Sequence, residues 1–138
     1  VHFSGHGEEE DPDDRFRGGL VFHSDDFQGQ KEVDADRLGK IFRRIKKSHP
    51  QLKVVLLNAC YSEPQAKAIS ENDIYAIGVS DKLASLAARL FAAGFYRKYV
   101  MSNDIEQAVD FGLTQALTED GNIEDLVHLF YQGKRISV

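Results

Sequence analysis

The chain contains one cysteine, no tryptophan, one methionine and three prolines among its 138 residues. A single cysteine cannot form a disulfide within the chain, which excludes the disulfide-rich class of small secreted domains and favours a reducing compartment such as the cytoplasm. The chain also lacks an apolar run near the roughly 18 residues that a membrane span needs. No basic-then-apolar secretory signal is recognisable either. We therefore expect a cytoplasmic protein with no membrane partner.

Basic residues are also fewer than acidic residues. The 17 Lys and Arg are outnumbered by 22 Asp and Glu, and the net charge is -5. Because contacts to phosphates need clustered Lys and Arg, we expect no direct contact with nucleic acid. The one basic stretch, residues 43–47, comes late in a predicted helix, where cations suit the helix dipole and solvent exposure.

The remaining composition is that of an ordinary globular domain, with 42% hydrophobic and 28% charged residues. A chain of 138 residues suits one domain, and we assign residues 1–138 to it. The chain starts at Val1 with residues that already look like a strand, so we expect it to be a C-terminal portion of a longer chain.

Strand-like and helix-like segments alternate along the sequence. We predict strands over residues 1–4, 20–22, 53–58, 74–79 and 126–131, and helices over residues 35–47, 64–70, 83–98 and 105–117. The acidic residues 8–14 and the polar residues 25–31 are predicted loops. The strands at 53–58 and 74–79 are short apolar runs, typical of strands buried on both faces. The alternation predicts an α/β fold with a mainly parallel sheet.

The first predicted helix has the clearest signals. Asp34 is its expected N-cap, and Pro50 marks its end. Its apolar residues recur at helical spacing and should form one buried face: Leu38, Ile41, Phe42 and Ile45. For the helix over residues 105–117, either Asn103 or Asp104 could be the cap.

Two segments place a reactive side chain just beyond a predicted strand. One is Ser4-Gly5-His6-Gly7, and the other is Asn58-Ala59-Cys60-Tyr61. The carboxyl ends of parallel strands lie at one edge of the sheet, where open α/β proteins bind their ligands. If the two strands are neighbours, His6 and Cys60 meet at that edge.

Such a pair is suited to nucleophilic catalysis. A thiolate is the reactive form of cysteine, and a neighbouring imidazole stabilises it. His6 could then protonate the leaving amine as a general acid. The backbone N–H groups of Gly7 and Cys60 are candidates for the oxyanion hole, because glycine lets a substrate approach the backbone closely.

The ordered set of motifs resembles the caspase-like cysteine peptidases of clan CD. The separation of His6 and Cys60, 54 residues, is similar to the caspase spacing. The segment 4–7 looks more like metacaspases and their bacterial relatives than like animal caspases. The segments Asn58-Ala59-Cys60-Tyr61-Ser62-Glu63, Ile77-Gly78-Val79-Ser80-Asp81, Phe91 to Tyr96 and Asp104 to Ala108 resemble bacterial CHAT-type caspase-like domains over nearly the whole chain.

This resemblance implies a three-layer αβα sandwich around a sheet of about six strands, with the histidine after the third. Compared with that family's strand order, the chain lacks the first two strands. Upstream domains or a partner chain would supply them to complete the sheet. It also implies an endopeptidase that cleaves a protein partner or its own chain, as a bacterial signalling or defence effector. No cofactor is implied.

Substrate specificity depends on the position two residues before the cysteine. Metacaspases carry an aspartate there that helps to bind a basic P1 side chain, whereas this chain has Asn58. Asn58 is therefore a candidate substrate-binding residue without charge. Asp81 or Glu63 could restore a negative charge to the pocket, and of these Asp81 is the candidate we name.

Two other functions use the same residues. The domain could be a catalytically silent caspase-like scaffold, or a different Cys-His amidase or acyl-transfer enzyme. A metal site would have to combine His2, His6, Cys60 and His23, and apart from the two nearby histidines these lack the usual zinc spacing. We expect no metal.

Overall fold

The computed structural model describes the backbone at residues 2–4, 6–8 and 19–23 and from residue 30 to the end, and the side chains from residue 34 onward. The described elements are β1 (His2–Ser4), β2 (His6–Glu8), β3 (Gly19–His23), β4 (Gln30–Val33), α1 (Ala35–Ser48), β5 (Val54–Asn58), α2 (Glu63–Ser70), β6 (Tyr75–Val79), α3 (Ser85–Ser102), α4 (Ile105–Ala116), α5 (Ile123–Leu126), β7 (Val127–Tyr131) and β8 (Lys134–Ile136).

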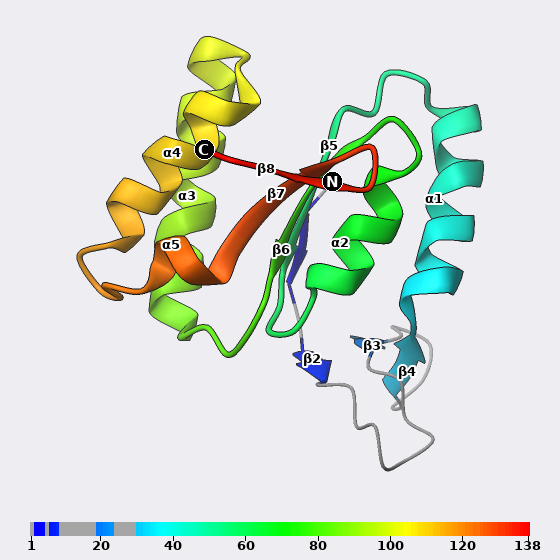
Figure 1. Cartoon of the computed structure of the whole chain (residues 1–138), viewed down its shortest axis with the longest axis horizontal. Helices are drawn as coiled ribbons and strands as arrows, with labels where there is room; N and C mark the ends of the chain where they lie inside the picture. The colour runs from blue at the N-terminus through cyan, green and yellow to red at the C-terminus, as the bar shows by residue number, and fades with distance from the viewer. Residues whose placement is uncertain (1, 5, 9–18, 24–29) are drawn as a thin grey trace.

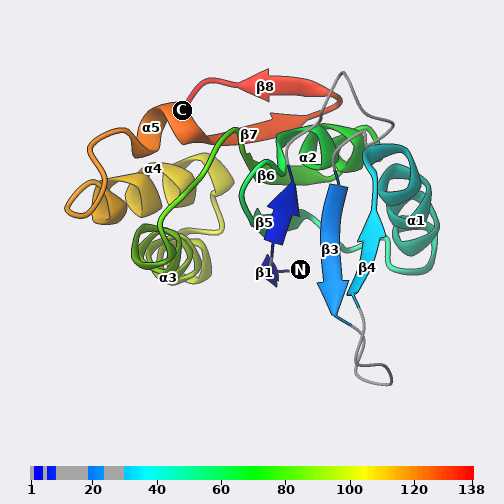
Figure 2. The ribbon, with the colours of Figure 1, turned by 90° about the horizontal axis from the view of Figure 1, so that it is seen from below.

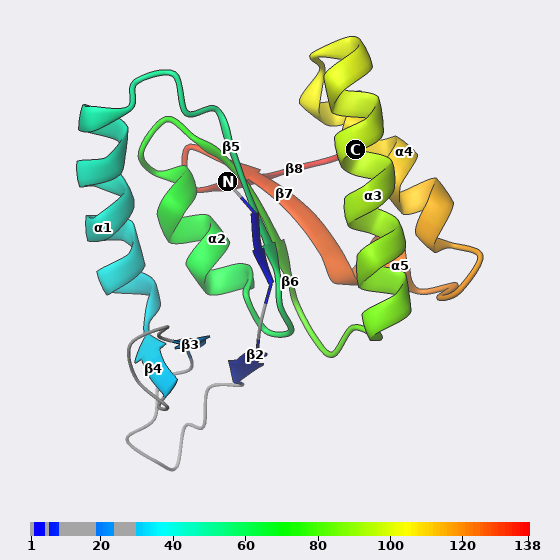
Figure 3. The same cartoon turned by 180° about the vertical axis from the view of Figure 1, so that it is seen from behind.

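The larger sheet has the strand order β1-β5-β6-β7-β8. β1 and β6 both run parallel to β5, whereas β7 pairs antiparallel with β6 and β8 antiparallel with β7. Helices α1 and α2 lie on one side of this sheet, and α3 and α4 lie on the other (Figures 1 and 3). The fold is thus α/β with three layers.

A separate antiparallel sheet has the order β2-β3-β4. β4 leads directly into α1, and β3 and β4 lie beyond the amino end of that helix (Figures 1 and 2). This sheet contains a hairpin, of which the sequence predicted only the arm at residues 20–22. Most of the predicted acidic loop, residues 9–14, lies outside the described residues.

The sheet differs from the sequence prediction in one respect. It is mixed, where a mainly parallel sheet of about six strands was expected, and five strands of it are described. The antiparallel strands are at the C-terminal end, where β7 runs antiparallel to β6 and β8 returns along β7 after a two-residue turn at Gln132 and Gly133. Both turn residues have positive φ, as tight hairpins require. β2, β4, α5 and β8 are short and mostly polar, so their patterns predicted no elements.

β5 is buried on both of its faces, as its apolar sequence predicted. Val54 and Leu56 pack in one hydrophobic cluster with residues of α3 and α4. Val55 and Leu57 pack in a second cluster with residues of α1 and α2. Burying each of these side chains contributes about 1.5–3 kcal/mol, so the strand is held from both sides.

The helix caps explain where α1 and α4 begin. Asp34 accepts a hydrogen bond from Arg37 N at 2.9 Å, as predicted. Asp104 accepts from Gln107 N at 3.1 Å and caps α4. Asn103 instead ends α3, in the left-handed conformation with φ 53° that favours asparagine. α3 therefore extends four residues past the predicted end at 98.

Among the described residues, no helix is both long enough and apolar enough to cross a membrane.

Helices α3 and α4 pack closely because glycine occupies the contact. A Cβ added to Gly112 would lie 2.8 Å from Phe91 O and 2.9 Å from its Cδ2. Phe91 is fully buried and cannot move aside without disturbing the core. The close approach of these two helices thus depends on the missing side chain at Gly112.

We predict that Gly112→Ala destabilises the chain by about 1–3 kcal/mol, because the new methyl group overpacks Phe91. Urea unfolding followed by circular dichroism measures this change. Gly39→Ala is the matched control, since Gly39 is also inside a helix and its added Cβ would meet Ala68 at an ordinary 3.5 Å. The control should gain about 0.5–1 kcal/mol from helix propensity. Equal effects of both variants would contradict this prediction.

A tyrosine hydrogen bond links the end of β7 to the loop before β6. The Tyr131 hydroxyl donates to Asp73 Oδ1, and its ring stacks on Tyr75 at 4.3 Å between centroids. This hydrogen bond to a carboxylate raises the pKa of Tyr131 above its ordinary value. The bond therefore stabilises the fold below the ordinary tyrosine pKa of about 10, and its contribution is lost as pH rises through the higher folded pKa.

Between about pH 8 and about pH 11, the wild-type chain should therefore lose more stability than Tyr131→Phe, which has no proton to lose at this position. The difference is measured from urea midpoints at the two pH values. Parallel pH profiles for the two chains would show that the Tyr131–Asp73 bond contributes nothing to stability.

Candidate functional site

The register of β1 and β5 relates the two predicted catalytic positions. Ser4 is paired with Asn58, and the strands run parallel. His6 lies two residues beyond Ser4, and Cys60 lies two residues beyond Asn58. Because neighbouring strands are about 4.8 Å apart, Ser4 and Asn58 lie side by side at the carboxyl edge of the sheet. That His6 and Cys60 meet at this edge stays a prediction.

The surroundings of His6 are described for the backbone alone. His6 opens β2 opposite Val21, and Gly7, the predicted oxyanion-hole residue, lies opposite Leu20. His6 thus begins a new strand after the end of β1, in place of a loop. Its side chain lies outside the part of the chain whose side chains the structure describes.

Cys60 sits in the turn between β5 and α2, with its side chain partly exposed. Its Sγ accepts a hydrogen bond from Leu83 N at 3.2 Å and lies 3.7 Å from Leu83 O, to which the thiol can donate. Leu83 belongs to the loop between β6 and α3. The sulfur therefore lies between two loops at the carboxyl edge of neighbouring strands. No sequence signal pointed to Leu83, because its contribution comes from the backbone.

The turn that carries Cys60 is strained and firmly attached. Tyr61 has φ 57°, in the left-handed region that costs a non-glycine residue about 1–2 kcal/mol. The fully buried Ser62 donates its hydroxyl to Leu57 O at 3.2 Å and accepts from Val79 N at 3.0 Å. Ser62 thus ties the turn to β5 and β6 at once, and these bonds offset the strain at Tyr61.

Gly78 allows this attachment. A Cβ added to Gly78 would lie 2.7 Å from Ala66 Cβ and 3.0 Å from Ser62 O. The start of α2 can therefore lie directly on β6 only because position 78 has no side chain. The Ile77-Gly78-Val79 pattern thus has a packing role beside the turn that carries Cys60.

Glu63 and His128 form a side-chain pair that the sequence did not predict. Glu63 Oε2 lies 3.1 Å from His128 Nδ1, and His128 is 7% exposed. Gly78 and His128 are partners across β6 and β7, so the pair connects the start of α2 to β7. The Glu63 carboxylate, a candidate source of negative charge for a substrate pocket, is engaged by His128. The one sequence signal for His128 is its position as a polar residue inside the apolar run at residues 126–131.

The two predicted substrate-binding residues have different surroundings. Asn58 is 9% exposed, and its Nδ2 donates to Ala88 O in α3 at 3.0 Å. Its amide group thus holds the end of β5 against α3. Asp81 is exposed in the loop after β6, where its Oδ1 accepts from Lys82 N at 2.7 Å. Asp81 is therefore available to solvent at the same edge as Cys60.

A cavity lies at a different part of the described molecule. It has a volume of about 620 Å³ and is lined by Ile45, His49, Gln51, Leu52, Lys53, Val54 and Tyr99. These residues lie near the amino end of β5, at the opposite edge of the sheet from Cys60. The chemistry of the candidate site therefore rests on the loops at the carboxyl edge, and this cavity is separate from them.

The described side chains contain no group of three or more His, Cys, Asp and Glu placed to hold a metal ion.

Comparison with models of known protein families finds no match to this chain. A search of curated proteins finds no match either.

Removal of the Ser62 hydroxyl tests how the turn that carries Cys60 is held. We predict that Ser62→Ala costs about 1–3 kcal/mol, because it leaves the buried Val79 N–H and Leu57 carbonyl without this partner. Ser80→Ala is the matched control, since the Ser80 hydroxyl is exposed and donates to carbonyls at 3.3 Å. Thermal unfolding of both variants measures the difference. A control that costs as much as Ser62→Ala would show that the buried bonds are not the cause.

Proposed function

We propose that the chain is a cysteine endopeptidase of the caspase-like type, related to the bacterial CHAT-type domains, with His6 and Cys60 as its catalytic pair. The observation that carries the proposal is the parallel pairing of Ser4 with Asn58, since His6 and Cys60 follow these partners at equal distances in sequence. The three-layer α/β architecture and the partial exposure of Cys60 also support it.

The reaction would proceed in two stages. The Cys60 thiolate attacks the carbonyl carbon of the scissile peptide bond, and the oxyanion that forms accepts hydrogen bonds from the N–H groups of Gly7 and Cys60. The C–N bond then breaks, and His6 gives its proton to the leaving amine. A thioester links the remaining acyl group to Cys60.

Water completes the cycle. His6 takes a proton from a water molecule as the water attacks the thioester carbonyl. The C–S bond breaks, the acid is released, and the Cys60 sulfur recovers its starting state. A cofactor is not needed, because both proton transfers use His6 and the electrons stay within the bonds that form and break.

The surroundings of the site bear on the substrate. The Asn58 amide is engaged by α3, which favours a positioning role for the strand end over direct contact with a P1 side chain. The exposed Asp81 carboxylate is left as the group able to attract a basic residue of a protein or peptide substrate. We propose such a substrate, cleaved in a reducing compartment such as the cytoplasm.

A catalytically silent scaffold is the second candidate. It is favoured by the two contacts between the Cys60 sulfur and the backbone of Leu83, which occupy the sulfur within the fold. In a peptidase these contacts must yield when substrate binds, whereas in a scaffold they would persist. A Cys-His amidase would share the catalytic pair and differ in its substrate.

Covalent labelling with a peptidyl acyloxymethyl-ketone probe tests the proposal. Cys60→Ala should abolish labelling, because the probe needs the thiolate. His6→Ala should slow labelling by about 10²–10⁴-fold, the usual contribution of a general acid–base residue. His49→Ala is the matched control, since His49 is an exposed histidine after α1 and should leave the rate unchanged.

Labelling of Cys60 without dependence on His6 would refute the catalytic pair. Absence of labelling in a chain with the circular dichroism spectrum and unfolding midpoint of a folded protein would favour the scaffold. Cleavage of small amides in the absence of peptide cleavage would favour the amidase.

A further inference from the structure

The outer face of α1 carries a concentrated positive charge on an otherwise acidic chain. Five of the 17 basic residues lie on it, and all five are exposed: Arg37, Lys40, Arg43, Arg44 and Lys47. At 100° per residue these positions fall on one side of the helix, opposite the buried Leu38 and Phe42. The stripe, defined as these five residues, is about 15 Å long at 1.5 Å per residue.

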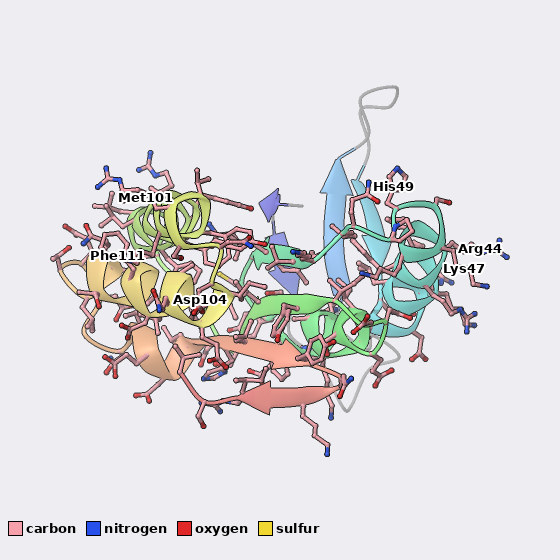
Figure 4. All side chains as sticks on the ribbon, turned by 90° about the horizontal axis from the view of Figure 1, so that it is seen from above. Arg44, Lys47, His49, Met101, Asp104 and Phe111 are labelled. Atoms are coloured by element: carbon pink, nitrogen blue, oxygen red, sulfur yellow. The ribbon has the colours of Figure 1, made fainter. Side chains whose placement is uncertain are left out.

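Within the part of the chain whose side chains are described, the stripe takes no part in ion pairing. None of the five forms an ion pair with a residue whose side chain the structure describes, where the one ion pair is His128–Glu63. Lys46 differs, since its Nζ donates to Pro50 O at 2.9 Å and to Leu52 O at 2.7 Å. Arg44 and Lys47 point away from the rest of the molecule (Figure 4).

The surface beside the stripe has two further features. Ile41 was expected on the buried face of α1, but it is 45% exposed and lies next to the stripe. On the other side, Lys40 and Arg43 border a hollow of about 170 Å³ between α1 and α2. Asp36 and Glu71 also line this hollow, so positive charge prevails toward the C-terminal half of the helix.

We propose that the outer face of α1 is a docking surface for an acidic segment of another protein, one that carries an apolar residue among its carboxylates. The stripe would pair with the carboxylates, and Ile41 would contact the apolar side chain. This inference goes beyond the peptidase activity. α1 ends near the amino end of β5, whereas Cys60 follows its carboxyl end, so a segment on the C-terminal half of α1 leaves the Cys60 turn uncovered.

Two features favour a protein segment over a nucleic acid or a membrane. The net charge of -5 repels an extended polyphosphate beyond the short stripe, while a short acidic segment meets only the local positive charge. Ile41, beside the stripe, can contact an apolar side chain of a protein partner. A phosphate backbone has no apolar group to contact it. A flat bilayer would need a wider apolar face than one exposed isoleucine offers.

Fluorescence anisotropy with a labelled acidic peptide tests the docking surface on the 138-residue chain. The probe is a peptide of about 12 residues with glutamates every three or four positions and one leucine, to match helical spacing on α1. Arg43→Glu/Arg44→Glu should weaken its binding at least about tenfold, because two favourable charge contacts become repulsive. Ile41→Ala should weaken the leucine peptide about threefold or more and leave a leucine-to-serine peptide unchanged.

Arg89→Glu/Arg97→Glu is the matched control, since it changes the net charge equally at two exposed positions of α3. If binding depends on the charge of the stripe, this control should change the dissociation constant by less than about twofold. Salt screens the interaction between the peptide and charges that lie far from it. An equal loss in both double variants would overturn the proposal, because net charge alone would then explain binding. Tighter binding of a duplex DNA or of phosphatidylserine vesicles than of the peptide would also overturn it, as would no peptide binding.

Discussion

The burial of β5 on both faces fixes the two helical layers and the place of the Cys60 turn. Val54 and Leu56 need an apolar layer on one side, and Val55 and Leu57 need one on the other. Two helical layers are required to keep all four from water, and parallel partners β1 and β6 satisfy the backbone of the strand. Packing on both faces fixes the position of the end of β5, and the turn that carries Cys60 begins there.

Strain and close packing are concentrated in that turn. Tyr61 takes a left-handed conformation, Ser62 bonds to both neighbouring strands, and Gly78 lets α2 begin directly against β6. Such strain persists only when the surrounding structure determines the local conformation. Proteins often place reactive groups in such turns, which is consistent with a catalytic use of Cys60.

Local patterns predicted the long elements well, because they are properties of a few consecutive residues. The cap at Asp34 and the apolar run before Cys60 each lead to an element with nearly the predicted bounds. β8 was not predicted, because Lys134–Ile136 is stabilised by pairing with β7 and not by its own pattern. Ile41 was placed on the buried face by periodicity, yet α1 covers too narrow a part of the core to bury it.

By itself, the sequence determined the α/β class, the strand before Cys60 and the reactive residue types, since burial and helix capping act over short distances. Only the tertiary structure decided the mixed sheet, the engagement of Asn58 by α3, the pairing of Glu63 with His128 and the contacts of the Cys60 sulfur with Leu83. Each of these contacts joins segments that are far apart in the sequence and lie side by side only in the folded chain. The separation of 54 residues does not by itself bring His6 near Cys60. Their proposed proximity depends on the register of β1 against β5, which is a property of the folded sheet.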